Sequence, residues 1–216
     1  MLFAACGQLV YYTLKEAEDR CFQSERVMAM KKRVLKSLVN KVILGLLLVV
    51  FSGPCVFAVD IVPCDLFTQA DAEALFAVTV PEGVTRDAMT PAGKSCRYTF
   101  EKEGASYGLT LKICTTRAIA EEGIFDSASD VFERQVKARQ GNAEAAKKFK
   151  KIEALGEDAL WEGTALWVLD GDVLLIITVR SPLDGSFESR EAMDAAQEAK
   201  NLSLSLEVAE TALSRL

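Results

Sequence analysis

Apolar and polar residues alternate with the period of a β-strand in two stretches near the middle of the chain. One face of CRYTF carries Cys96, Tyr98 and Phe100, and one face of YGLTLKICT carries Tyr107, Leu109, Leu111 and Ile113. Placing Phe100 opposite Tyr107 brings these apolar sets together on one side of a hairpin. A slip of one residue would expose the whole set, so we predict a hairpin over residues 96–114 in this register.

A second group of apolar runs predicts a three-stranded meander. DALWE, ALWVL and DVLLIITVR are separated by Gly163 and by Asp170-Gly171. An Asp-Gly pair between apolar runs is a strong hairpin signal and predicts a turn that pairs Leu169 with Asp172. Residues 173–179 are almost continuously apolar, which indicates a strand covered on both faces.

Helical signals surround these strands. TQAD, from Thr68, and SASD, from Ser127, each predict a helix start with a capping box. Gly141-Asn142 predicts a break, followed by a second helical piece over residues 143–150. The last helix is indicated by apolar residues spaced three and four apart, namely Ala192, Ala196, Ala199, Leu202, Leu206, Ala209 and Leu213.

This order, α-ββ-α-βββ-α, predicts the α+β class, with an antiparallel sheet made of the hairpin and the meander and packed against helices. Residues 81–95, rich in proline and glycine, are expected to form a loop.

The N-terminal part predicts export. Residues 42–51 form a short apolar run that follows five basic residues and precedes Gly53-Pro54. Such a pattern is typical of a secretory signal peptide, and small residues predict cleavage after Ala58. We therefore divide the chain into residues 1–27, an upstream over-call or extension, a signal peptide over 28–58, and one extracytoplasmic domain over 59–216. The alternative is a retained signal, with residues 42–58 as a membrane anchor.

Charge and histidine content exclude several classes of function. Residues 59–216 contain 17 Lys and Arg against 27 Asp and Glu, a net charge of −10. A surface this acidic repels nucleic acid and anionic lipid, so neither is an expected partner. The chain has no histidine, which excludes histidine-based catalysis and zinc sites of the Cys/His type. No nucleotide-binding motif is present, and we expect no cofactor and no metal.

Three cysteines lie in the predicted domain. The hairpin register turns Cys96 toward the core and Cys114 away from it, so these two are not expected to bond. Cys64, just before the first helix, is the better partner for Cys96, which leaves Cys114 as a free thiol. Both Cys55 and Cys64 follow a proline, which does not fit a lipid-attachment site.

Trp161 and Trp167 lie on neighbouring predicted strands. One hypothesis is that they stack on a ligand; core packing is the more common use of tryptophan.

Together, PCDLFTQADAEALF, CRYTF and LGEDALWEG, followed by the 165–179 hairpin and a terminal amphipathic helix, resemble one family. These are the small extracytoplasmic domains of bacterial envelope lipoproteins and of the outer part of some receptor kinases. The resemblance covers most of residues 62–215 and implies a PsbP-like sandwich with a Cys64–Cys96 disulfide. The chain departs from the family in lacking the lipid-attachment cysteine and in having Leu155 beside Gly156-Glu157-Asp158.

These features predict an exported soluble domain of the cell envelope, periplasmic or secreted, and not an enzyme. It would bind a small ligand or an envelope protein through the sheet or the 81–95 loop. Three alternatives stay open: a signal-anchored membrane protein with the same outer domain, an enzyme that depends on Cys114 or a carboxylate, and a structural subunit of an envelope complex.

Overall fold

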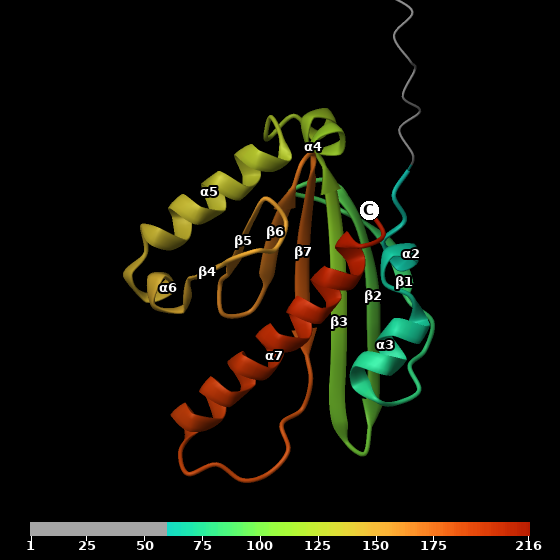
Figure 1. Cartoon of the computed structure of the whole chain (residues 1–216), viewed down its shortest axis with the longest axis vertical. Coiled ribbons are helices and arrows are strands. Elements are labelled where there is room, and N and C mark those ends of the chain that lie inside the picture. The colour runs from blue at the N-terminus through green and yellow to red at the C-terminus, as the bar shows by residue number, and fades with distance from the viewer. Residues whose placement is uncertain (1–59) are drawn as a thin grey trace, which may run out of the picture. The chain divides into compact units, whose positions relative to one another are not determined.

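A computed structural model describes residues 60–216, one unit of the chain. A seven-stranded sheet runs through this unit in the order β1-β2-β3-β7-β6-β5-β4, and every neighbouring pair is antiparallel (Figure 1). Helices pack on both of its faces. The predicted α+β class is therefore confirmed. The predicted signal peptide, the cleavage after Ala58 and the alternative membrane anchor lie outside the described residues.

The strands are β1 (Val84–Ala88), β2 (Gly93–Lys102), β3 (Ala105–Thr115), β4 (Lys150–Ile152), β5 (Asp158–Trp161), β6 (Leu166–Asp170) and β7 (Val173–Arg180). The helices are α2 (Pro63–Leu66), α3 (Gln69–Phe76), α4 (Thr116–Glu122), α5 (Ala128–Gln140), α6 (Ala143–Lys148) and α7 (Arg190–Leu213).

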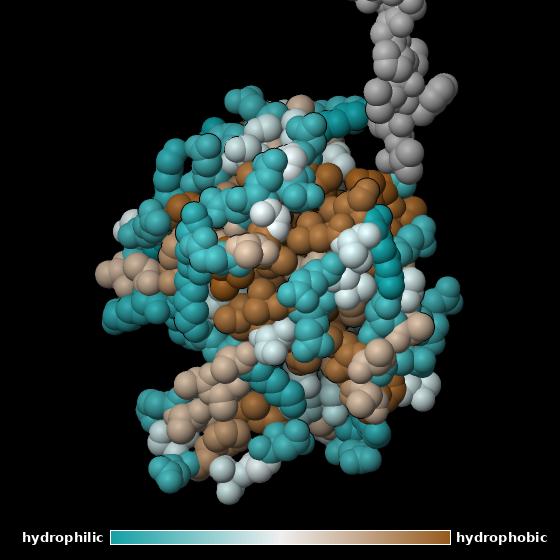
Figure 2. Space-filling view, viewed as in Figure 1, coloured by the Kyte–Doolittle hydropathy of each residue, from teal (hydrophilic) through white to brown (hydrophobic). Residues whose placement is uncertain are grey.

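One face of the sheet, which we call the inner face, carries the larger core. The short helices α2 and α3 and the long helix α7 cover it (Figure 1). Its buried side chains include Cys96, Tyr98, Leu111, Trp161 and Ile177. Figure 2 shows apolar side chains gathered in the middle of this side of the molecule, with hydrophilic side chains around them. The inner face is thus closed by three helices that come from both ends of the described chain.

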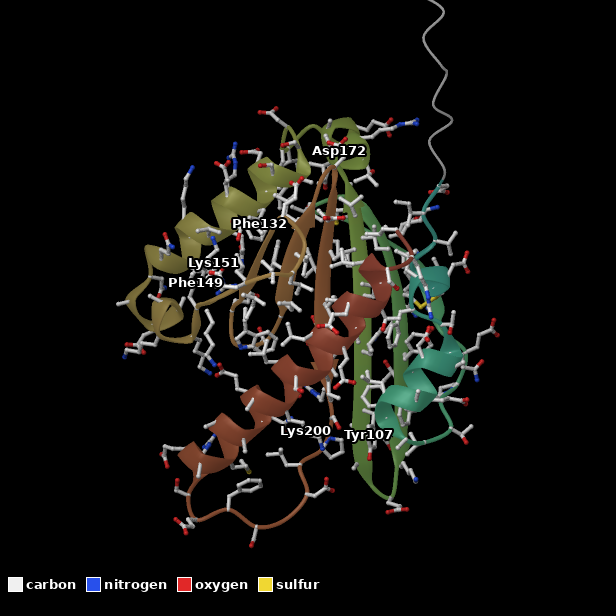
Figure 3. The ribbon with its side chains drawn as sticks, in the orientation of Figure 1. Tyr107, Phe132, Phe149, Lys151, Asp172 and Lys200 are labelled. Carbon is white, nitrogen blue, oxygen red and sulfur yellow. A yellow bond between two sulfur atoms is a disulfide. The ribbon has the colours of Figure 1, made fainter. Side chains whose placement is uncertain are left out.

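The opposite face, the outer face, is covered over only part of its width. A second core joins side chains of α4 and α5, such as Ile119 and Phe132, to Leu160, Leu174 and Cys114 of the sheet. Figure 3 shows Phe132 on α5 beside these strands. β1 and β2 contribute no side chain to this second core. The outer face is therefore apolar under α5 and exposed toward the β1 edge.

The β2–β3 hairpin has the predicted register. Phe100 pairs with Tyr107, Tyr98 with Leu109 and Cys96 with Leu111. The alternation of apolar residues was sufficient here because the inner face is fully covered, so a slip of one residue would expose a whole row of core side chains.

The β6–β7 turn was predicted wrongly. Leu169 pairs with Leu174, not with Asp172, and Asp170 pairs with Val173. The two central residues are Gly171, with φ of 54°, and Asp172. The carbonyl of Asp172 accepts a hydrogen bond from the amide of Thr116 at 2.8 Å, so contact with the start of α4 helps to place the turn. The shift moves each partner by two residues and therefore leaves every side chain on its expected face.

Local signals predicted the helix starts well. Thr68 and Asp71 form the expected capping box, and the Ser127 hydroxyl accepts from the Asp130 amide at the start of α5. The second motif is not a full capping box, because the Asp130 carboxylate accepts from the amide of Asp126 instead. Asn142 caps α6 after the predicted break at Gly141.

Four elements differ from the expectation. Cys64 lies on α2, a short helix that was not predicted, and α4 was not predicted either. The 81–95 segment contains β1 and the start of β2, and residue 150 begins β4 instead of ending a helix. Both unexpected strands are edges of the sheet, where a strand is exposed and needs no apolar alternation. In the last helix the predicted residues Ala192 and Ala199 are exposed, because α7 meets the sheet mainly along its C-terminal half.

Candidate functional site

The Cys64–Cys96 disulfide ties α2 to the inner face of β2 with 5.1 Å between the two Cα atoms. Beside it, the buried hydroxyl of Tyr98 donates to the carbonyl of Phe67 at 2.7 Å. Burial raises the pKa of Tyr98 to about 12, so the phenol stays protonated and keeps this hydrogen bond. A Cβ on Gly83 would lie 2.6 Å from the Cys96 sulfur. The region is a tightly packed structural anchor without space for a ligand.

Cys114 is free and completely buried under the segment that precedes β2. Its sulfur lies 3.6 Å from the carbonyl of Pro91, and Gly93 leaves no space above it. Burial raises the pKa of the Cys114 thiol to about 11, and the charge of Lys112 offsets only part of that effect. Because the thiolate is the nucleophile, a buried thiol with this pKa is poorly suited to covalent chemistry.

The structure does not bring Trp161 and Trp167 together. Trp161 belongs to the inner core, and its indole N–H donates to the carboxylate of Glu198 at 3.2 Å. Trp167 packs against the outer core, and its buried indole nitrogen has no partner among the described residues. The two rings lie on opposite faces of the sheet, so they cannot stack on one ligand.

The most closely held carboxylates serve structural roles. Glu122, on α4, accepts hydrogen bonds from the amides of Thr90 and Ala92 at 2.9 and 2.8 Å. Although burial opposes ionisation, these bonds lower the pKa of Glu122. In residues 60–216 no group of three His, Cys, Asp or Glu side chains could hold a metal ion.

A different arrangement occupies the exposed part of the outer face. The ladder places Arg86, Arg97, Lys112 and Arg180, from β1, β2, β3 and β7 in turn, on this same side. Hydroxyl side chains lie between them at Ser95, Thr99, Thr110 and Thr178. We call these four cations and four hydroxyls the cationic surface. It contains the charge and hydrogen-bond donors that recognise an anion.

These cations have no carboxylate partner among the described residues. Arg86, Arg97, Lys112 and Arg180 form no ion pair within 4.0 Å, and neither does Lys102 at the hairpin tip. Every other Lys and Arg of residues 60–216 lies within that distance of an acid, including the four lysines of KKFKK. Unpaired cations are thus concentrated on one face of a domain whose net charge is −10.

The cations hold only weak internal partners. The Arg97 Nε donates to the hydroxyl of Thr99 at 3.1 Å, and the Lys112 Nζ donates to the carbonyl of Met89 at 3.4 Å. Neither bond is an ion pair, although the charge of Lys112 acts on the nearby Glu122 carboxylate. An external anion would therefore not have to displace an ion pair within 4.0 Å.

A hollow of about 300 Å³ opens at the β1 end of this surface. Its lining residues are Pro81, Glu82, Val84, Arg86, Arg97 and Thr99. Glu82 is the one acid in this lining, and it forms no ion pair with either arginine. The hollow therefore offers two cations, a hydroxyl and an exposed valine to a ligand.

This surface is hard to predict from the amino-acid sequence. The four cations come from three separate segments of the chain, and no two of them are adjacent in sequence. Alternation does place Arg97 and Lys112 on the face opposite Cys96, but only the pairing of β1 and β7 with this hairpin brings Arg86 and Arg180 beside them.

Comparison with known proteins does not assign the chain to a class. No family model matches it, and neither the curated proteins nor the solved structures contain a match. Within residues 60–216 no helix combines the length and apolar character needed to span a bilayer.

Proposed function

We propose that this protein is an exported, non-enzymatic binding domain of the cell envelope, and that the cationic surface binds an anionic ligand or partner. The observation that supports this most directly is the concentration of unpaired cations on one exposed face. Elsewhere in residues 60–216 every Lys and Arg except Lys102 lies within 4.0 Å of an acid, as expected for an acidic domain that balances its charge locally.

The chemistry of the surface suits carboxylate or phosphate groups. Arginine presents a planar set of donors that can bind both oxygens of such a group, and a charge-assisted hydrogen bond is stronger than a neutral one. Arg86 and Arg97 are diagonal neighbours across β1 and β2, since Val84 pairs with Arg97 and Arg86 with Ser95. Diagonal positions lie about 7–8 Å apart, within reach of two long side chains that converge on one anion.

Export and an oxidising compartment are part of the same proposal. The predicted signal peptide and the disulfide between Cys64 and Cys96 favour it, because disulfides persist mainly outside the cytoplasm. The resemblance to small extracytoplasmic envelope domains points in the same direction. A retained signal would tether the same domain to the membrane through residues 42–58 and would leave the binding proposal unchanged.

The test of binding is an NMR titration of residues 59–216 with citrate, a tricarboxylate probe, at about 0.15 M salt. Saturable shifts of the Arg86 and Arg97 side-chain N–H signals are expected. Arg86→Gln with Arg97→Gln should weaken binding more than about tenfold, since each lost charge-assisted bond contributes about 1.5–3 kcal/mol.

The matched control is Arg117→Gln with Arg134→Gln, which removes two exposed arginines that are paired within their own helices. It should leave citrate binding unchanged. Equal shifts at all arginines, or equal loss in both double variants, would show that the cationic surface is not a site.

The enzymatic alternative predicts a reactive Cys114. Native protein treated with iodoacetamide at pH 7.5 should remain unmodified at Cys114, and the same thiol should react once the protein is unfolded. Peptide mass spectrometry gives both results. Rapid alkylation of the native protein would instead favour the thiol-dependent enzyme.

A further inference from the structure

We propose that β1 accepts an extended acidic segment of a partner protein as an additional strand. This rests on the proposed function and specifies the partner: a peptide backbone that pairs with β1 and carries acidic side chains over the cationic surface. β1 is an edge of the sheet, so one side of it has no neighbouring strand among residues 60–216. The exposed edge and the unpaired cations are adjacent, and together they define one site.

The hydrogen bonds of β1 show which of its backbone groups face outward. β2 ends at Lys102 in a two-residue turn, and the residues that flank such a turn form a hydrogen-bonded pair, so every second residue of β2 counted back from Lys102 faces β3. Ser95 is one of the other residues and faces β1, so its partner Arg86 points its backbone groups toward β2, where the Ser95 hydroxyl also donates to the Arg86 carbonyl at 3.3 Å. Backbone groups alternate in direction along a strand, and the N–H and C=O of Thr85 and Asp87 therefore point away from the sheet. These two residues offer the donors and acceptors that an incoming strand needs.

The two edges of the sheet differ in how well they are protected. β4 has three residues, two of them lysines, and both lysines are paired with acids, Lys150 with Glu198 and Lys151 with Asp158. A short, lysine-rich strand is a common protection against unwanted pairing. β1 has five residues, and Val84 on it is 50% exposed. The more accessible edge is therefore the one beside the unpaired arginines.

Charge complementarity selects an acidic occupant. An incoming strand places every second side chain on the outer face, about 6.8 Å apart. One such side chain lies opposite Arg86, and the next lies opposite Val84, which itself pairs with Arg97. Glutamates at positions i and i+2 would thus meet Arg86 directly and reach Arg97 across the small side chain of Val84. Glu82 disfavours a further acid beyond Val84.

Other occupants fit less well. A second copy of this domain that paired through β1 would continue the same sheet and bring two cationic surfaces side by side, which charge repulsion opposes. A polyanion without amide groups, such as an acidic polysaccharide, could bind the arginines but would donate no backbone N–H to Thr85 or Asp87. A protein segment uses both features of the site, as in other cases of strand addition.

The test uses the synthetic peptide SVEVEVS, with blocked ends, and residues 59–216 of the protein. Binding is followed by NMR, together with hydrogen exchange at the Thr85 and Asp87 amides, which should slow at least about tenfold. SVKVKVS, with the opposite charge, and a backbone N-methylated SVEVEVS should both bind at least about tenfold more weakly.

Variants of the protein separate the two parts of the site. Asp87→Pro removes an outward-facing donor while leaving the β1–β2 hydrogen bonds, and it should weaken peptide binding at least about tenfold. Asp87→Ala removes the same charge but keeps the donor, and it should bind the peptide normally. The N-methylated peptide gives the same information should Asp87→Pro disturb β1.

The outcomes distinguish this inference from the proposed function. Unprotected Thr85 and Asp87 amides, or equal binding of the N-methylated peptide, would overturn strand addition and leave anion binding intact. Peptide and citrate binding that both persist in Arg86→Gln with Arg97→Gln would overturn the cationic surface itself. A dimer that forms through β1 would also contradict the acidic-partner assignment.

Discussion

The two halves of the outer face are built on one continuous sheet and differ in almost every other property. Under α5, the strands present Leu160, Trp167 and Leu174 to a second core. Toward the β1 edge, the neighbouring strands present Arg86, Arg97 and Lys112, and β1 and β2 contribute no side chain to the second core. One face of a single sheet thus lines a core under α5 and forms a polar surface near β1.

The inner face explains how one sheet can serve both purposes. It is buried along nearly the whole sheet and supplies most of the core. Strand register is therefore set by inner side chains such as Cys96 and Leu111. The side chains on the outer face of β1 and β2 do not pack in a core and need not be apolar. Cations at those positions add little to stability, so their presence needs a reason other than folding.

The largest expected effect comes from the disulfide that joins α2 to the inner face of β2, behind the exposed half of the outer face. Replacing both Cys64 and Cys96 by alanine should lower the free energy of unfolding by about 3–4 kcal/mol, because the bond closes a loop across 32 residues and both sulfurs leave a packed site. Urea unfolding measures this loss. An unchanged urea midpoint in the double variant would mean that the bond between α2 and β2 does not stabilise this part of the sheet.

A core substitution on the covered half should have nearly as large an effect. Phe132 is 3% exposed and fills the space between α5 and the sheet. Phe132→Ala should cost about 3 kcal/mol. Phe125→Ala, at a partly buried position next to the same core, should cost clearly less. Equal costs at the two positions would contradict the boundary drawn around the second core.

A smaller effect is expected from the ion pair that joins the C-terminal segment to the start of α3. Arg215 donates to the Asp71 carboxylate, at 2.9 Å for one of its two bonds, and this bond lowers the pKa of Asp71 well below its usual range. Because the pKa of Asp71 is lower in the folded than in the unfolded protein, this pair adds its full contribution to the free energy of unfolding above about pH 4. That contribution is lost as the pH falls further.

Asp71→Asn should therefore cost about 1–2 kcal/mol at pH 6 and less near pH 2.5. Denaturation of both proteins at the two pH values tests the sign. Lys137→Gln, which removes an exposed pair within α5, is the control and should change stability little at either pH. A difference that grows toward low pH would contradict the role given to Asp71.

The smallest expected change is in the stability of the charge variants. Arg86→Gln with Arg97→Gln should alter the free energy of unfolding by less than about 0.5 kcal/mol, since both side chains are exposed and unpaired. Calorimetry compares the variant with the native sequence. A large loss would mean that these arginines serve the fold, and a gain would fit relief of repulsion between neighbouring cations.

Several parts of the fold follow from local physics and could be read from the chain. The alternation in CRYTF and YGLTLKICT defined the first hairpin, the Thr68–Asp71 capping box defined the start of α3, and the spacing of apolar residues defined α7. Each of these signals comes from residues close together in one segment, through alternation, helical spacing or a hydrogen bond at a helix start. The same register argument separated Cys96 from Cys114 and favoured the disulfide that the structure contains.

The features that could not be predicted from the sequence depend on contacts between segments that are far apart in the chain. The turn at Gly171 is placed with the help of a hydrogen bond from the start of α4, and β1 is a strand through its pairing with β2. Trp161 and Trp167 lie on opposite faces of the sheet. The sequence alone determined the fold class, the main register and the acidic charge, because these depend on composition and local period. The tertiary structure alone decided that Arg86, Arg97, Lys112 and Arg180 share one exposed face, because only strand order brings separate segments side by side.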